Sequence, residues 1–399
     1  MSPLYLDRVA DALRLKQEQF IDEQHDAAEK HQVLRRWLDE LRTLSKRQVL
    51  ERLAEIDGAR FGALPTDEQD VPEFTFPFQD GKQWSNHRQG RSWALDVLAG
   101  VTTFAADGSA IDINSDMSVP LGLVQVGWFQ NPHDAALPYV KDVSVEIIAA
   151  KDLEATHSPE LEVGWRRYAG ETARAIEFME NHAGQPAVAF LDGTLTISFV
   201  RNMPPERQEQ YRECVKGLIE KSQETGVPAV GFVDASRSVD LVTLLLTLKK
   251  RQQVDYEEVR SWKVHDASLL RALRPPLGWG DRARTYICDR DDRVPGNEYY
   301  AQICFSYMQT ARQAAPARLE MPRWVCEDPA RLAWVLDVVR AECVVGVGYP
   351  YPLETADSVA VLTSEDRERF YRLFQEFATQ NAISVRFSRK SISKRGRRL

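Results

Sequence analysis

The stretch Ala187–Thr194, which reads AVAFLDGT, is the part of this 399-residue sequence that decides the fold. Five apolar residues lead directly into Asp, Gly and a hydroxyl residue. Two other stretches have a similar form: VTTFAADGS at 101–109 and AVGFVDAS at 229–236. Each pattern predicts a buried strand that ends at a polar loop. Since sites in α/β sheets assemble at strand ends, we expect three carboxylates there. These are Asp107, Asp192 and Asp234.

A tight turn is the alternative interpretation of any one Asp-Gly pair, and for a single pair it is the more common one. Three Asp residues placed directly after apolar runs favour a shared role instead. Carboxylates that lie together repel one another and are costly to bury, and a divalent cation offsets this cost. Their oxygen atoms suit Mg²⁺ or Mn²⁺. A Gly after the Asp lets a phosphodiester backbone approach without a clash at Cβ.

The rest of the chain predicts an α/β fold with a mixed β-sheet flanked by helices. Strands are expected at 101–106, 121–129, 143–149, 187–191, 229–233, 285–288, 301–307 and 343–347. Helices are expected at 161–182, 204–225, 237–250, 329–341 and 365–380. These elements define an α/β domain at 95–385.

The N-terminal region predicts a separate helical arm at 1–60, because apolar residues recur there at helical spacing. It is either an outer helical layer or an arm for dimerisation or partner docking. Gly and Pro residues then predict a linker or extended segment at 61–94.

Composition bounds the class of protein. Hydrophobic residues make up 43% of the chain, no apolar run approaches the roughly 20 residues of a membrane span, and the five cysteines form no CxxC pair. We therefore expect a cytoplasmic protein with reduced thiols. The net charge of −8 disfavours a surface covered by nucleic acid.

Basic residues gather locally in a tail at 386–399. This tail is either a solvated charge run or a contact for DNA phosphates or an acidic partner. The residues expected to touch DNA are Arg389, Lys390, Lys394 and Arg395.

Two further carboxylates could join a site. Glu171 lies on the helix that precedes the Asp192 strand, with Arg167 four residues earlier on the same helical face. The alternative for Glu171 is a solvent-facing ion pair with Arg167. Asp357 lies just inside a helix that follows a Pro-braced turn, where the helix dipole alone also favours a carboxylate.

Taken together, these motifs resemble the NurA nuclease family. The stretches that carry the resemblance are Ala106–Ser109, Arg167 with Glu171, Leu191–Thr194, Ser236–Ser238 and Tyr349–Asp357. The resemblance implies an RNase H-like nuclease core and Mn²⁺-dependent action on DNA ends. It also implies a homodimer and a HerA-type hexameric ATPase as partner, in end processing for repair or phage defence.

The resemblance implies that Asp107, Glu171 and Asp192 are catalytic metal ligands. Asp357 stands where the family often has His, and Asp can serve as the fourth ligand. Asp234 stands where the family commonly has Lys. Glu177 is the alternative to Glu171, since a single sequence does not fix the register of this helix against the family pattern.

The implied chemistry is phosphodiester hydrolysis with two Mn²⁺ or Mg²⁺ ions per site. Arg237 is expected to clamp the phosphate, or else to form a structural ion pair. Tyr349 and Tyr351 are expected to stack on an unpaired base, or else to pack under the turn. Two rival functions remain: an inactive NurA-like scaffold that binds DNA and an ATPase, and an RNase H-like ATP-binding protein, which the lack of further Gly-rich loops disfavours.

Overall fold

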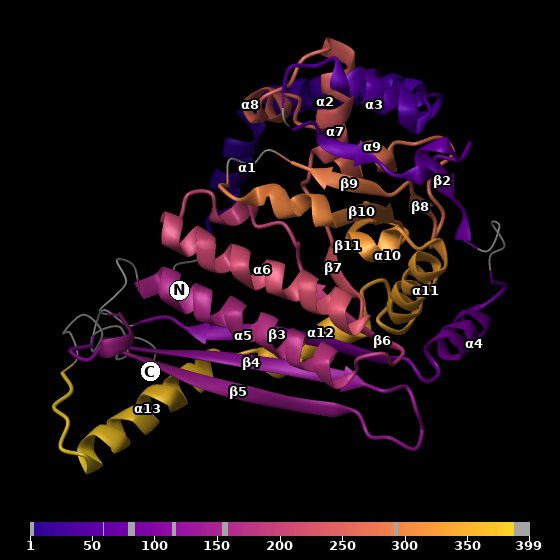
Figure 1. Cartoon of the computed structure of the whole chain (residues 1–399). Coiled ribbons are helices and arrows are strands. Elements are labelled where there is room, and N and C mark those ends of the chain that lie inside the picture. Colours follow the sequence, from indigo (N-terminus) through magenta and orange to yellow (C-terminus); the bar gives the residue numbers. More distant parts are fainter. Residues whose placement is uncertain are drawn as a thin grey trace. The chain divides into compact units, whose positions relative to one another are not determined.

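The computed structural model describes residues 4–58, 60–78, 84–113, 117–153, 159–290 and 294–386. The chain forms two compact units, each built from separate segments (Figure 1). The first unit contains Met1–Gln83, Asp234–Arg293 and Ile303–Leu319. The second unit contains Trp84–Val233, Val294–Gln302 and Glu320–Leu399.

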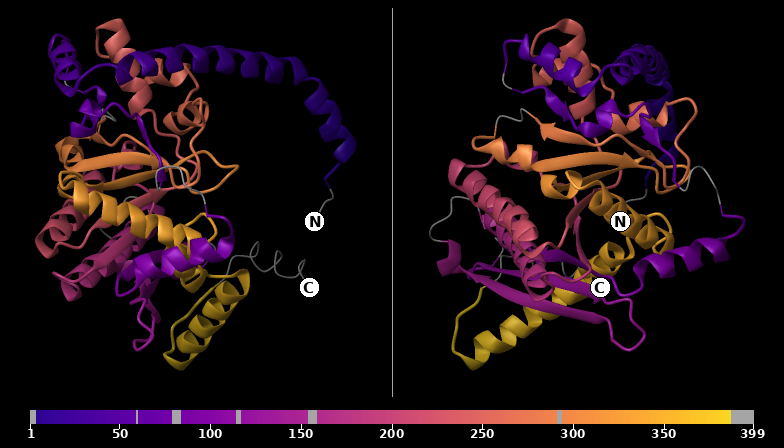
Figure 2. Two further views of the ribbon diagram at one scale, coloured as in Figure 1. Left: turned by 90° about the vertical axis from the view of Figure 1, so that its right-hand side faces the viewer. Right: turned by 45° about the vertical axis from the view of Figure 1, so that its right-hand side comes forward.

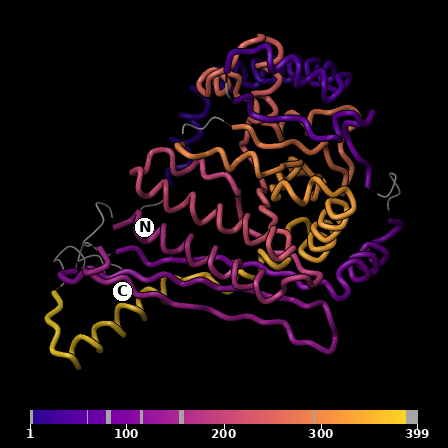
Figure 3. Tube along the Cα trace, in the orientation of Figure 1, coloured from indigo at the N-terminus to yellow at the C-terminus, as the bar shows by residue number. Residues whose placement is uncertain are grey.

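The second unit contains an RNase H-like sheet. Strands β3 (Thr102–Ile111), β4 (Leu121–Asn131) and β5 (Val140–Ala149) form an antiparallel meander, drawn in purple in the lower part of Figure 3. Strands β6 (Ala187–Asp192) and β7 (Ala229–Val233) run parallel to β3, and the strand order is β7-β6-β3-β4-β5. This order is that of the RNase H fold. The expected mixed sheet flanked by helices is therefore confirmed.

Helices cover both faces of this sheet. They are α4 (His87–Leu98), α5 (Pro159–Asn181), α6 (Pro205–Thr225), α10 (Arg323–Cys326), α11 (Pro329–Val345), α12 (Tyr351–Ala360) and α13 (Ser364–Gln380). The rings of Phe104 in β3 and Phe178 in α5 stack with their centroids 4.6 Å apart. On β4, the Gln125 side chain donates a 3.0 Å hydrogen bond to the Ala360 carbonyl of α12.

The two helices α5 and α12 lie on opposite faces of the sheet. A Cβ atom added at Gly108 of β3 would meet α5, whereas one added at Gly127 of β4 would meet α12. Gly127 pairs with Asp107 across the two strands, so the two residues share a face. Because side chains alternate along a strand, Asp107 faces α12 and its neighbour Gly108 faces α5.

The first unit combines helices with shorter strands. Its helices are α1 (Leu6–Arg14), α2 (Gln17–Arg42), α3 (Lys46–Ala54), α7 (Asp240–Lys250), α8 (Tyr256–Ser261) and α9 (Asp266–Arg271). Its paired strands are β1 (Gly62–Pro65), β2 (Thr75–Phe76), β8 (Arg282–Ala283), β9 (Tyr286–Asp289) and β10 (Ile303–Met308). Figure 2 shows α2 as one long helix that α1 precedes.

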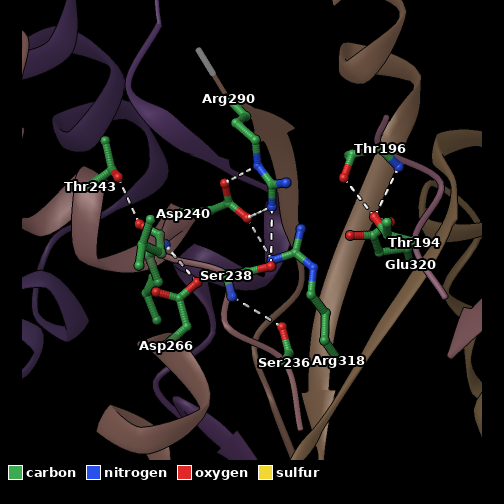
Figure 4. A network of polar contacts seen from close by, with 12 residues as sticks. Thr194, Thr196, Ser236, Ser238, Asp240, Thr243, Asp266, Arg290, Arg318 and Glu320 are labelled. Atoms are coloured by element: carbon green, nitrogen blue, oxygen red, sulfur yellow. Dashed lines mark hydrogen bonds and ion pairs between the residues drawn. The ribbon is translucent and has the colours of Figure 1, made fainter. Parts of the chain in front are cut away.

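A buried ion cluster organises the start of α7 in the first unit (Figure 4). The Asp240 carboxylate accepts from Arg290 at 2.6 Å and lies 2.7 Å from Nη1 of the fully buried Arg318. These two guanidinium groups hold the pKa of Asp240 low against the opposing effect of its burial. Asp266 accepts the backbone N–H groups of Leu241 and Val242, both at 3.0 Å. Asp266 thus supplies acceptors for two N–H groups in the first turn of α7 that have no partner within the helix.

One expectation about local structure is wrong. Residues 343–347 do not form a strand, because α11 extends to Val345. Periodicity cannot distinguish a short buried apolar run in a helix from one in a strand. Residues 61–94, expected to form a linker or an extended segment, contain the extended strands β1 and β2 and the start of α4. Strand β1 forms only by pairing with β9, more than two hundred positions later, which local sequence does not reveal.

Candidate active site

Asp107 and Asp192 lie side by side on neighbouring parallel strands. Ala106 of β3 is level with Leu191 of β6, so the next residue on each strand is a carboxylate. Asp192 is the last residue of β6 and is exposed, as expected for a strand end. Asp107 does not end its strand, because β3 continues to Ile111. The expectation of a strand end at Asp107 is thus wrong, since pairing with β4 carries β3 onward past the Asp-Gly pair.

Asp357 of α12 is the third carboxylate near this point. The pKa of Asp107 is raised to about 6, mainly by burial and also by the negative charges of Asp357 and Asp192. The backbone of Gly108 and the positive charge of Arg167 act in the opposite direction. Asp107 is therefore a half-buried carboxyl group within electrostatic reach of two others.

Glu171 approaches the same point from α5. A Cβ atom at Gly108 would lie 2.5 Å from Oε1 of Glu171 and 2.4 Å from Cγ of Arg167, so only Gly allows this close contact. The pKa of Glu171 is raised to about 7, mainly by burial and also by the charges of Asp107 and Asp192, while the charge of Arg167 and the backbone of Gly108 act in the opposite direction. Oε1 is buried and accepts no hydrogen bond from the described part of the chain.

The buried residue Glu320 holds the loop after Asp192 in place, and the sequence patterns did not predict this role (Figure 4). One oxygen of the fully buried Glu320 accepts from the Thr194 hydroxyl at 2.7 Å and from the Leu195 N–H at 2.6 Å. Gly193 has a φ of 122° and donates its N–H to the Phe232 carbonyl of β7 at 3.0 Å. Glu320 belongs to no sequence motif. Its role depends on a contact with a segment more than a hundred positions away, so a local pattern could not reveal it.

Tyr349 contacts the site directly. Its hydroxyl donates a 2.8 Å hydrogen bond to Oδ1 of Asp192, and its ring packs edge-on against Phe232 with centroids 5.1 Å apart. The preceding turn holds Val347 and Gly348 at positive φ. Tyr351 instead packs edge-on against Phe129, 5.7 Å between centroids, which matches the packing alternative for that residue.

The chemistry of the donor set fits a hard divalent cation, since every acidic group here is a carboxylate. The buried Oε1 of Glu171 accepts no hydrogen bond from the described residues, and its ion pair with Nε of Arg167 spans 3.8 Å. Within the residues that the structure describes, however, no three His, Cys, Asp or Glu side chains are arranged closely enough to hold an ion. A bound cation would offset the repulsion between these carboxylates.

Glu177 does not take part in this group of carboxylates. Glu177 forms a 2.6 Å hydrogen bond with Arg174 on the exposed side of α5, so Glu171 and not Glu177 lies beside Gly108. Asp234 and Arg237 are exposed residues of the first unit. The basic residues expected to contact DNA, Arg389, Lys390, Lys394 and Arg395, lie outside the described residues.

An RNase H-like sheet with Asp107 and Asp192 side by side where β3 and β6 meet is the arrangement expected of a nuclease. The NurA domain model matches residues 101–362, and the chain therefore belongs to the NurA family. No curated protein matches the sequence. None of the helices in the described ranges has both the length and the apolar character of a membrane span.

Solved structures similar to the chain include two of NurA. One was determined with manganese (11% identity, 69% of this chain, 89% of the other, TM-score 0.33) and one with dAMP and manganese (12%, 67%, 86%, TM-score 0.35). The catalytic domain of human endonuclease V also matches (11% identity, 75% of this chain, 95% of the other, TM-score 0.30).

Proposed function

We propose that this NurA-family protein is a Mn²⁺- or Mg²⁺-dependent nuclease that hydrolyses phosphodiester bonds at DNA ends. The observation that carries the proposal is that Asp107 and Asp192 lie side by side on β3 and β6, with Asp357 and Glu171 close enough to take part in the same electrostatic interactions. Burial and neighbouring carboxylates raise the pKa values of Asp107 and Glu171. Carboxyl groups whose pKa values are raised by burial and by one another are typical of sites that bind a cation or transfer protons. The NurA structure with dAMP and manganese supports the choice of ligand.

The proposed metal ligands are Asp107, Glu171, Asp192 and Asp357, enough for two ions. Two bound ions would supply a hydroxide nucleophile and stabilise the leaving oxygen. Tyr349 fixes the orientation of Asp192 through its hydroxyl hydrogen bond. Glu320 accepts a hydrogen bond from the backbone of the loop that follows Asp192. This contact would keep the Asp192 carboxylate in position when metal ions bind.

Two partners are also proposed. Helices α1 and α2 expose a series of large apolar side chains: Leu6, Val9, Leu13, Phe20 and Ile21. Apolar residues spaced in this way on an exposed helix favour docking of another helix. We propose that this arm binds either a second copy of the chain or a HerA-type ATPase, in the cytoplasm. Leu13→Glu with Phe20→Glu, assayed by light scattering and by ATPase co-purification, would tell the two apart.

The test of the proposed function is degradation of end-labelled linear DNA with Mn²⁺, Mg²⁺ or EDTA. Asp107→Asn, Asp192→Asn and the control Glu177→Gln, which alters an exposed carboxylate on α5, are assayed beside the wild type. Metal-dependent loss of label that only the first two substitutions abolish supports the proposal. No degradation by folded protein, with the partner ATPase present, would overturn it in favour of the scaffold that binds DNA without cutting. The Asp234 and Asp357 departures from the family pattern are the features in favour of that scaffold.

A further inference from the structure

Arg167 is the positive charge of the carboxylate cluster. It lies on α5 one turn before Glu171, and its aliphatic stem packs directly on Gly108, the residue after Asp107. Its Nη1 donates a 3.2 Å hydrogen bond to the Gly108 carbonyl. The stem and one donor are therefore fixed on β3, and the rest of the guanidinium group lies beside the site.

Within the residues that the structure describes, most donors of this guanidinium group have no protein acceptor. An arginine carries five N–H donors. Arg167 makes one hydrogen bond there, and its Nε forms an ion pair with Oε1 of Glu171 at 3.8 Å, a distance too long for a hydrogen bond. The side chain is 48% exposed. The guanidinium group therefore has N–H donors available to a ligand at the site.

The neighbouring arginine on the same helix shows the contrast. Arg166 donates to Glu162 at 2.7 Å and to Glu146, and it lies 3.4 Å from Asp152. Its donors are taken up by three carboxylates, as expected of a structural ion cluster. On helix α5, Arg166 is therefore bound in a structural ion cluster, whereas Arg167 has N–H donors available beside the carboxylates of the site.

We propose that Arg167 binds the non-bridging oxygens of the phosphodiester that is cleaved. This inference rests on the proposed function, and it assigns to Arg167 the phosphate contact that sequence patterns suggested for Arg237. Four ionised carboxylates and one guanidinium group leave an excess of three negative charges. Two divalent ions and one phosphodiester bring the total to zero, so the site is neutral only when the phosphate is bound. A planar guanidinium group matches two phosphate oxygens at once, which an ammonium group does not.

The test compares Arg167→Gln, Arg167→Lys and the control Arg174→Gln. Arg174 lies two turns later on α5, bound to Glu177 and stacked on Trp128, away from Gly108. We expect Arg167→Gln to lower kcat/KM roughly 100-fold, as loss of one preorganised donor group does, with Lys restoring only part. In a further variant, Arg167→Ala, free guanidinium ion should partly restore nuclease activity. The Mn²⁺ affinity of the Arg167 variants, measured by calorimetry, should stay within about threefold of the wild-type value.

A binding assay separates this inference from the proposed function. Binding of labelled oligonucleotides is measured by fluorescence anisotropy with Ca²⁺ in place of Mn²⁺. One oligonucleotide has only charged phosphates, and each of the others has one terminal linkage replaced by a neutral methylphosphonate. Arg167→Gln should bind the charged DNA about tenfold more weakly than wild type does, and it should bind at least one methylphosphonate DNA with the same affinity as wild type. If wild type cuts DNA but Arg167→Gln cuts and binds equally well, this inference is overturned and the nuclease stands. If wild type never cuts, the nuclease proposal fails, and the binding result alone decides whether Arg167 is a phosphate ligand.

Discussion

The Tyr349 hydroxyl donates a 2.8 Å hydrogen bond to Oδ1 of Asp192, across 157 positions of the sequence. The bond joins the turn before α12 to the end of β6. It therefore links the segment that carries Asp357 to the strand that carries Asp192. The orientation of one proposed metal ligand thus depends on the folding of the segment that carries another.

Removing this bond should reduce activity without unfolding the protein. Tyr349→Phe keeps the ring against Phe232 and deletes only the hydroxyl, so the Asp192 carboxylate loses a fixed donor. A hydrogen bond to a charged group contributes about 1.5–3 kcal/mol, and a partly exposed one falls at the low end. We expect kcat/KM to fall about tenfold and the Tm to change by less than 2 °C or so. Tyr351→Phe is the matched control, and an equal loss in both variants would contradict the role given to Tyr349.

A methyl group at position 108 should disrupt the site. In Gly108→Ala the new Cβ would lie 2.4 Å from Cγ of Arg167 and 2.5 Å from Oε1 of Glu171, so α5 or both side chains must shift. Overpacking of this kind costs about 1–3 kcal/mol. We expect weaker Mn²⁺ binding and at least a tenfold loss of nuclease activity.

Gly217→Ala is the control for that experiment. Gly217 lies inside α6, and an added Cβ would meet nothing within 4 Å. Alanine favours a helix over glycine by about 1 kcal/mol, so this variant should be more stable and equally active. Full activity of Gly108→Ala with normal Mn²⁺ affinity would show that Arg167 and Glu171 do not act from these positions.

Glu320 should matter for activity although it lies under the site. Glu320→Gln keeps the shape and one acceptor oxygen, and we expect a loss of two- to tenfold in kcat. Glu320→Leu leaves the Thr194 hydroxyl and the Leu195 N–H without their acceptor, which costs about 1–3 kcal/mol per buried group. Denaturant unfolding and nuclease assays, run on both variants, check this. Wild-type kcat in Glu320→Leu would mean that the Asp192 loop holds its shape without the carboxylate.

The metal-free protein should lose stability as the pH rises. The folded state raises the pKa of Glu171 from 4.5 to about 7, so between these values the folded state holds a proton that the unfolded chain has released. The free energy of unfolding then falls from about pH 4.5 to pH 7 and is level above it. Glu171→Gln removes this loss, which amounts to on the order of 3 kcal/mol at pH 8.

Thermal unfolding in EDTA from pH 4 to pH 8 measures the effect. Glu171→Gln and wild type should unfold at similar temperatures at pH 4 and diverge as the pH rises, with the variant more stable at pH 8. Mn²⁺ binds the ionised groups, so its affinity for wild type should rise with pH up to about 7. The exposed Glu177→Gln is the control. Parallel Tm curves for wild type and Glu171→Gln would rule out a raised pKa at Glu171.

The sequence by itself determined the α/β class, the strands of the sheet and the kind of chemistry. Apolar runs that end in Asp fix β6 and β7 because burial and alternation are local properties of a strand. The same local pattern put Asp107 and Asp192 on two strands, and their level pairing in β3 and β6 follows from that parallel pair. The order of motifs was enough to indicate the NurA family.

Only the tertiary structure decided which side chains meet. Glu171 and Glu177 are both acidic residues of α5, and the choice between them depends on which face of the helix packs on Gly108. The contacts of Tyr349 and Glu320 with the Asp192 loop join segments more than a hundred positions apart. Such contacts depend on which distant segments of the chain the tertiary fold brings together, and no local pattern of residues encodes this.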